Sequence, residues 1–206
     1  WTVCHLRELL PTEQISRGLG APVPLEYAID ETNIDGLRFR PANSRRSMTF
    51  AESLAANYTD GMLILHRGKI VYERYSGCLN EAGKHGAMSM PAGDSGPNGD
   101  FEYLQTVKPE GEHGDGFHYK TVNSDALGWI ISRVTGKSVT ELLSERIWRR
   151  MGAEQDAYMT VDGLGTPFAG GGMSAGLRDL GRIGLLMLGE GEINGERLFS
   201  GEVVRN

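Results

Sequence analysis

The fold of this chain is indicated most directly by the stretch Gly116-Phe117-His118-Tyr119-Lys120-Thr121-Val122-Asn123-Ser124-Asp125-Ala126-Leu127-Gly128-Trp129. Tyr119 and Asn123 stand four positions apart, and an apolar pattern at helical spacing begins directly behind them. Gly136 supplies a stop signal after that pattern. We therefore expect a helix over about 122–134, with Tyr119 on the loop that enters it. The apolar positions of the expected helix are Ala126, Leu127, Ile130, Ile131 and Val134.

A second segment, His85-Gly86-Ala87-Met88-Ser89-Met90, carries a serine. Together the two segments resemble the serine β-lactamase-like hydrolases of the penicillin-recognising fold, and within them the 6-aminohexanoate-dimer (nylon-oligomer) hydrolases and related esterases. In that family a serine opens a helix within a Ser-x-x-Lys motif, and a tyrosine on a loop before another helix completes the site. Ser89 and Tyr119 stand in those two places.

The resemblance implies hydrolysis of a small-molecule amide or ester through an acyl-serine, without a metal or another cofactor. Ser89 would be the nucleophile and Tyr119 its proton-transfer partner. Thr121 stands where relatives with Tyr-x-Asn carry the asparagine, so Thr121 or Asn123 would take that polar role. His118 would line the mouth of the pocket. We expect Ser89 and Tyr119 to meet at a cleft beside a hairpin over 61–76.

The family lysine is absent from the expected position, because the chain reads Ser89-Met90-Pro91-Ala92. A serine hydroxyl needs a nearby base, and general-base assistance contributes roughly 10²–10⁴-fold to a rate. The family also places a large helical insertion between the serine and the tyrosine. We therefore expect that a segment was lost between Met90 and Pro91, and that strands which follow in the family are missing. A catalytically inactive, truncated homologue is the first alternative function.

A second alternative is an α/β-hydrolase that uses Ser174, because Gly172-Met173-Ser174-Ala175-Gly176 matches the Gly-x-Ser-x-Gly elbow. That elbow requires a buried strand before the serine, and residues 165–171 do not have the composition of one. We interpret Ser174 as a cap on the following helix, with no strand entering it.

The expected fold class is α/β, an antiparallel sheet with flanking helices and a helical region of the β-lactamase/penicillin-binding-protein type. β-Branched and aromatic residues around Arg67-Gly68 predict a hairpin, 61–66 with 69–75. Residues 1–45 are interpreted as an irregular N-terminal arm, and residues 46–206 as an incomplete hydrolase domain. Further helices are expected over 47–57, 101–107 and 177–188, and one behind the capping box that Ser138 and Glu141 form.

The composition fits a globular domain, with 39% hydrophobic and 23% charged residues. A formal charge of −6 disfavours a nucleic-acid partner, and the absence of an 18-residue apolar run predicts no membrane partner. The five histidines lack metal-ligand spacing. Cys4 and Cys78 are expected to be unbridged. The compartment stays open, with the cytoplasm slightly favoured because the sequence shows no signal-peptide pattern. The substrate and the oligomeric state stay open.

Overall fold

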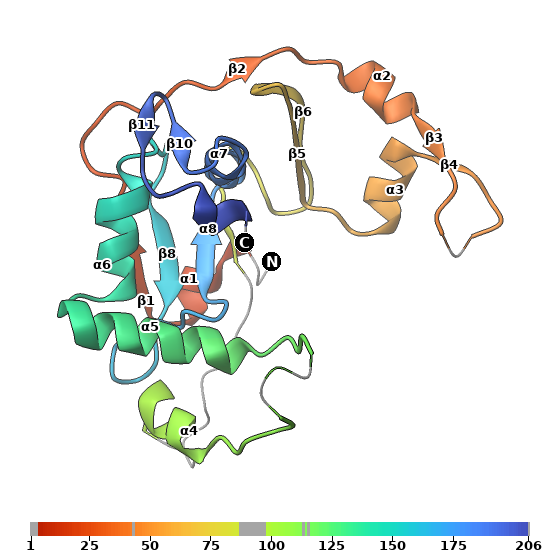
Figure 1. Cartoon of the computed structure of the whole chain (residues 1–206). Coiled ribbons are helices and arrows are strands. Elements are labelled where there is room, and N and C mark those ends of the chain that lie inside the picture. The colour runs from red at the N-terminus through yellow and green to blue at the C-terminus, as the bar shows by residue number, and fades with distance from the viewer. Residues whose placement is uncertain (1–3, 43, 87–97, 113, 115, 206) are drawn as a thin grey trace.

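The main sheet of the protein has four antiparallel strands in the order β1-β8-β9-β7. The structure is a computed structural model and describes residues 4–42, 44–86, 98–112, 114 and 116–205. Strand β1 comes from the N-terminal segment and pairs with β8, so the sheet joins distant parts of the chain (Figure 1). The strands are β1 (Thr12–Ile15), β7 (His85–Gly86), β8 (Ala157–Thr160) and β9 (Met173–Ala175).

The hydrophobic core lies between this sheet and the helices that follow residue 138. Trp148 and Met151 are fully buried against Ile15 of β1 and Met159 of β8. The Trp148 indole donates a hydrogen bond to the Gln155 carbonyl at 2.7 Å, so its polar atom is satisfied inside the core. Helix α7 contributes Leu186 to the same cluster.

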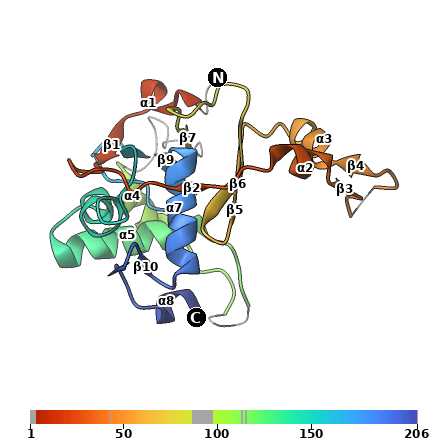
Figure 2. The same ribbon diagram turned by 90° about the horizontal axis from the view of Figure 1, so that it is seen from above.

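A second group of elements projects from the body as an arm, which both Figure 1 and Figure 2 show. Its base is a three-stranded sheet, β2-β6-β5, in which β2 runs parallel to β6. Its outer part is a small two-stranded hairpin flanked by two helices. The elements are β2 (Glu26–Tyr27), α2 (Glu31–Gly36), β3 (Arg38–Phe39), β4 (Met48–Thr49), α3 (Phe50–Ala56), β5 (Gly61–His66) and β6 (Lys69–Tyr75).

The remaining elements surround the main sheet. Helix α5 lies along one end of the body with α4 beside it, and α7 crosses near the hairpin β5–β6 (Figure 1). The elements are α1 (Leu6–Leu9), α4 (Asp100–Thr106), α5 (Thr121–Thr135), α6 (Val139–Leu143), the π-helical turn η2 (Ser144–Trp148), α7 (Leu177–Leu188), β10 (Glu192–Ile193), β11 (Glu196–Arg197) and α8 (Glu202–Arg205).

The locally encoded predictions are confirmed. The hairpin turns at Arg67 and Gly68, both of which have positive φ. Thr49 and Ser138 each form a capping box, with Glu52 and Glu141 respectively. Helix α5 ends at Gly136 in the left-handed conformation, as its stop signal predicted.

The apolar stripe of α5 lies on the surface and not in the core. Leu127, Ile130, Ile131 and Val134 are all exposed, and Val134 reaches 80%. The helix packs instead through Gly128, where an added Cβ would lie 2.6 Å from the Ala169 Cβ, and through Trp129, which stacks on Phe101. The periodicity therefore predicted the helix correctly but did not identify its buried side.

The expectation of an irregular arm over residues 1–45 is wrong for the segments that carry α1, β1, β2, α2 and β3. Strand β1 was not predicted because its four residues pair only with β8, which lies about 145 positions later in the sequence. The division of the chain into an N-terminal segment, residues 1–45, and a hydrolase domain, residues 46–206, stays a prediction.

A buried polar network ties α7 to the start of β8 and to the N-terminal segment. Asp179 accepts hydrogen bonds from the backbone amides of Glu154 and Gln155, at 2.8 and 3.0 Å. Its carboxylate also pairs with Arg182 at 3.1 Å, and both side chains are buried. Arg182 in turn donates to the Val23 carbonyl at 2.6 Å.

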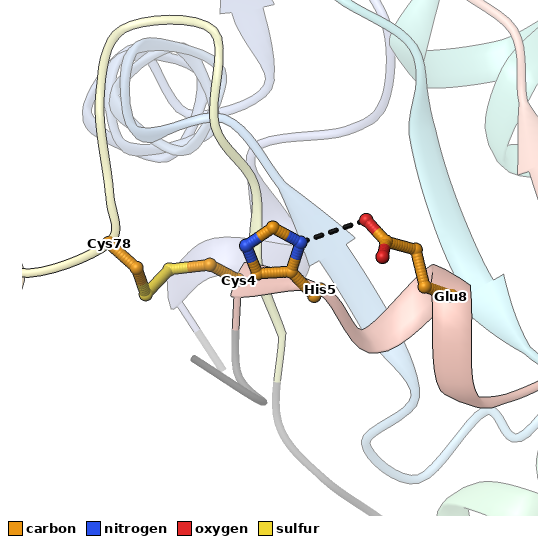
Figure 3. Close-up of a disulfide and its surroundings, with 4 residues drawn as sticks. All are labelled: Cys4, His5, Glu8 and Cys78. Carbon is orange, nitrogen blue, oxygen red and sulfur yellow. Dashed lines mark hydrogen bonds and ion pairs between the residues drawn. A yellow bond between two sulfur atoms is a disulfide. The ribbon is translucent and has the colours of Figure 1, made fainter.

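Cys4 and Cys78 form a disulfide, so the expectation that they are unbridged is wrong. The bond joins the segment before α1 to the loop after β6, although 74 positions separate the two residues (Figure 3). The His5 ring, next to Cys4, hydrogen-bonds Glu8 at 2.8 Å in the same view. Sequence spacing did not indicate this pair, because only the fold brings the two segments together.

Reduction of this disulfide is expected to destabilise the fold, because the bond restricts the unfolded chain. The expected loss is about 2–4 kcal/mol of unfolding free energy. Chemical denaturation of the native chain with and without a dithiol reductant measures it, and the Cys4→Ser/Cys78→Ser variant serves as a control that reductant should not affect. Equal midpoints for oxidised and reduced chain would contradict this prediction.

Candidate active site

Strand β7 leads the chain from the main sheet into the segment that carries Ser89. The backbone of β7 pairs with β9, with His85 opposite Ala175 and Gly86 opposite Ser174. Ser89 itself, and Ala92 at the family lysine position, lie outside the described residues. The expected meeting of Ser89 with Tyr119 beside the hairpin therefore stays a prediction.

The other four predicted site residues lie together at the entrance to α5. Tyr119 is 82% exposed, and His118 before it is exposed as well. Thr121 is the first residue of α5, and the exposed Asn123 donates its backbone amide to the Lys120 carbonyl at 3.1 Å. Lys120 pairs with Glu110 at 2.7 Å, so its charge is engaged on the surface. The site entrance thus presents a phenol, an imidazole and a side-chain amide to solvent.

Asp125 anchors the start of α5 to the turn before β9. Its Oδ1 accepts a hydrogen bond from the Gly170 amide at 2.7 Å. The two segments approach so closely that a Cβ on Gly170 would collide with the Thr121 side chain. Burial raises the pKa of the Asp125 carboxyl, and the Gly170 amide opposes that shift by stabilising the charged form. Asp125 was not among the residues predicted for the site, although the run Gly170-Gly171-Gly172 indicates close backbone approach.

Removal of the Asp125 carboxylate is expected to loosen this anchor. Asp125→Ala leaves the Gly170 amide without its partner, which costs about 1–3 kcal/mol of unfolding free energy. Asp125→Asn retains an acceptor oxygen and should lose less, and Ser124→Ala on the exposed side of the same turn should be near neutral. Urea denaturation of the three variants measures the difference; equal stability of the alanine and native chains would refute the anchoring role.

Three carboxylates gather where α4 meets α5 and the loop after β8. Asp162 accepts hydrogen bonds from the backbone amides of Asp100, Leu164 and Thr166, at 2.9, 2.9 and 2.8 Å. Burial raises the pKa of Asp100 to about 6, with further contributions from the charges of Asp125 and Asp162. With this raised pKa, Asp100 changes charge near pH 6; it lies in α4, the helix that follows the Ser89 segment along the chain.

The packing of α4 against α5 is expected to weaken as pH rises. The pKa of Asp100 is raised from 3.8 to about 6, so the folded state binds this proton more tightly than the unfolded chain does. The resulting stabilisation of the folded state is full below pH 3.8 and is lost as pH rises through about 6. Hydrogen-exchange protection of α4 amides, corrected for intrinsic rates, should fall over this range. In the Asp100→Asn variant, the protection of the α4 amides should no longer depend on pH over this range. Protection in the native chain that stays constant with pH would contradict the prediction.

Ser174 does not cap helix α7, and that part of the sequence interpretation is wrong. It is the middle residue of β9, only 8% exposed, and Gly176 is the N-cap residue of α7. Residues 165–172 form no strand, as expected, but β9 itself carries the serine. Ser174 lies in a strand because β9 pairs with β7 on one side and with β8 on the other. Its register partners are Gly86 and Tyr158. A nucleophile elbow places its serine on the turn between strand and helix, so Ser174 does not fit that role.

Within the described part of the chain, no cluster of three or more histidine, cysteine, aspartate or glutamate side chains has an arrangement that could hold a metal ion. Among the described helices, none combines the length and the apolar character needed to cross a bilayer.

Comparison with known proteins defines the class. The family model described as Beta-lactamase matches residues 85–201, which is more than half of the chain and includes β7, α5 and β9. The chain therefore belongs to the beta-lactamase family, as the resemblance of its Ser89 and Tyr119 segments predicted.

Two particular relatives refine this assignment. The chain is 42% identical over 107 residues to the 6-aminohexanoate-dimer hydrolase of Paenarthrobacter ureafaciens, a match that covers 52% of this chain and 27% of that protein. The chain thus spans about a quarter of the length of this curated relative. The structure of a putative 6-aminohexanoate-dimer hydrolase from Bacillus anthracis superimposes with a TM-score of 0.87 at 23% identity, over 100% of this chain and 72% of that one. The predicted β-lactamase-like fold is confirmed.

Proposed function

We propose that the chain carries the serine and tyrosine segments of a hydrolase that cleaves an amide or ester bond through an acyl-serine. The observation that carries the proposal is the 42% identity to a protein named 6-aminohexanoate-dimer hydrolase, over 107 residues. In this proposal Ser89 attacks the carbonyl carbon and Tyr119 transfers the proton. Thr121, Asn123 and His118 contact the substrate. A linear amide oligomer of 6-aminohexanoate and a simple carboxylester are the two substrate classes to test.

The geometry at the entrance of α5 supports the role of Tyr119. The phenol is exposed on a segment that the Asp125–Gly170 hydrogen bond and the close Thr121–Gly170 contact hold against the main sheet. These contacts position the backbone next to Tyr119, and a fixed backbone position is one requirement for an aligned proton-transfer group.

A specific observation favours the second candidate, a catalytically inactive homologue: Ala92 occupies the family lysine position. Without that amine, no lysine stands one helical turn after Ser89. The α/β-hydrolase alternative has no such support, because Ser174 lies buried within an antiparallel sheet.

The expected activity of the 206-residue chain on p-nitrophenyl esters is therefore low. Ala92→Lys should raise ester turnover by roughly 10²–10⁴-fold if the restored amine reaches Ser89. Ser89→Ala in that background should abolish the gain and Tyr119→Phe should reduce it, while the control variants Ser124→Ala and Tyr103→Phe should retain it. Turnover of the linear 6-aminohexanoate dimer then distinguishes an amidase from an esterase.

Two results would reject parts of this proposal. Strong turnover by the native chain that Ser89→Ala removes would show that another group replaces the lysine. Turnover that survives Ser89→Ala in the Ala92→Lys background would exclude Ser89 as the nucleophile.

A further inference from the structure

The outer hairpin of the arm carries a concentration of arginines. The segment 36–51 contains Arg38, Arg40, Arg45 and Arg46 and no aspartate or glutamate, in a chain whose net charge is −6. All four arginines are exposed. The two strands of the hairpin, β3 and β4, lie at the far end of the arm in both Figure 1 and Figure 2.

The positive charges of this hairpin are not neutralised within the described part of the protein. No ion pair forms there between any of the four guanidinium groups and a carboxylate. The two acidic residues that flank the segment have other partners: Asp35 binds Arg74 and the Tyr72 hydroxyl, and Glu52 accepts from the Thr49 amide. Four cations therefore face solvent at the tip of an otherwise acidic molecule.

The same hairpin also exposes apolar side chains. Phe39 is paired in register with Met48, and Arg38 with Thr49. Because side chains alternate between the faces of a strand, Phe39 and Met48 share one face, while Arg38 lies on the other. Phe39 is 42% exposed, and Leu37, directly before β3, is 59% exposed. The hairpin is thus amphipathic, with an accessible apolar face and arginines beside it.

We propose that this hairpin is a contact site for the surface of an anionic phospholipid membrane. Exposed aromatic and aliphatic side chains insert at the boundary between headgroups and acyl chains, and neighbouring arginines bind the phosphates. The position of the hairpin at the end of the arm limits contact to its tip, which keeps the acidic body away from a surface of the same charge. This contact needs no spanning helix, and it departs from the sequence-based expectation of no membrane partner.

A nucleic acid fits the same charges less well. Its phosphates would engage the arginines but leave the apolar face in water, and a long polyanion would extend along the acidic body. A membrane uses both faces of the hairpin at once.

The test is co-sedimentation of the full chain with vesicles of phosphatidylglycerol mixed with phosphatidylcholine. Binding should exceed that to phosphatidylcholine alone and should weaken as salt rises. Each arginine close to an anionic leaflet strengthens binding about fivefold, so Arg45→Gln/Arg46→Gln should weaken it about 25-fold. Phe39→Ser should also weaken binding, and the size of this loss should depend little on salt concentration.

The matched control is Arg146→Gln/Arg149→Gln, which removes the same charge from exposed positions on the body. This control should bind the mixed vesicles nearly as the native chain does, and thermal melting should show that all variants are folded. The proposal is overturned by an equal loss in the control and hairpin variants, by equal binding to both kinds of vesicle, or by no binding. Binding of duplex DNA, but not vesicles, that depends on Arg45 and Arg46 would also overturn it.

Discussion

The buried pair of Asp179 and Arg182 is the constraint on which the arrangement of the body depends. Both charges are removed from water, and each is stabilised by further hydrogen bonds, from the Glu154 and Gln155 amides and to the Val23 carbonyl. Such a pair contributes little compared with an apolar replacement, but loss of one member costs about 3–5 kcal/mol because the other charge stays buried. Through these contacts the pair connects α7 to the segment before β8 and to the N-terminal segment.

Both candidate catalytic segments are attached to the sheet that this pair helps to position. Strand β7, which precedes the Ser89 segment, is bonded to β9, and α7 begins two residues after β9. The turn before β9 holds Asp125, and through it the entrance of α5 with Tyr119. The strand that leads to the Ser89 segment and the helix entrance that follows Tyr119 are thus both attached to β9 or to the turn before it.

Features that depend on neighbouring residues were predicted from the sequence, whereas features that depend on partners far along the chain were not. The hairpin at Arg67-Gly68, the capping box of Ser138 and the stop at Gly136 each depend on residues within one or two turns, and all three were predicted. Strand β1, the Cys4–Cys78 disulfide and the position of Ser174 inside β9 depend on partners far along the chain, and these were missed. The four proposed site residues at the entrance of α5 lie within six positions of one another, so the sequence alone places them together. The Asp125–Gly170 anchor spans 45 positions and was not predicted.

The disulfide also turns the first part of the chain into a covalent ring. The ring runs from Cys4 to Cys78 and contains both β1, which belongs to the main sheet, and the whole arm (Figure 1). A protease that cuts the exposed arginine-rich loop of the arm would open the ring without releasing either piece. The N-terminal piece would keep its place beside β8, and the cut would become visible on a gel only after reduction. Nicked and intact molecules would thus differ in covalent mass only by the one water molecule that the cleavage adds.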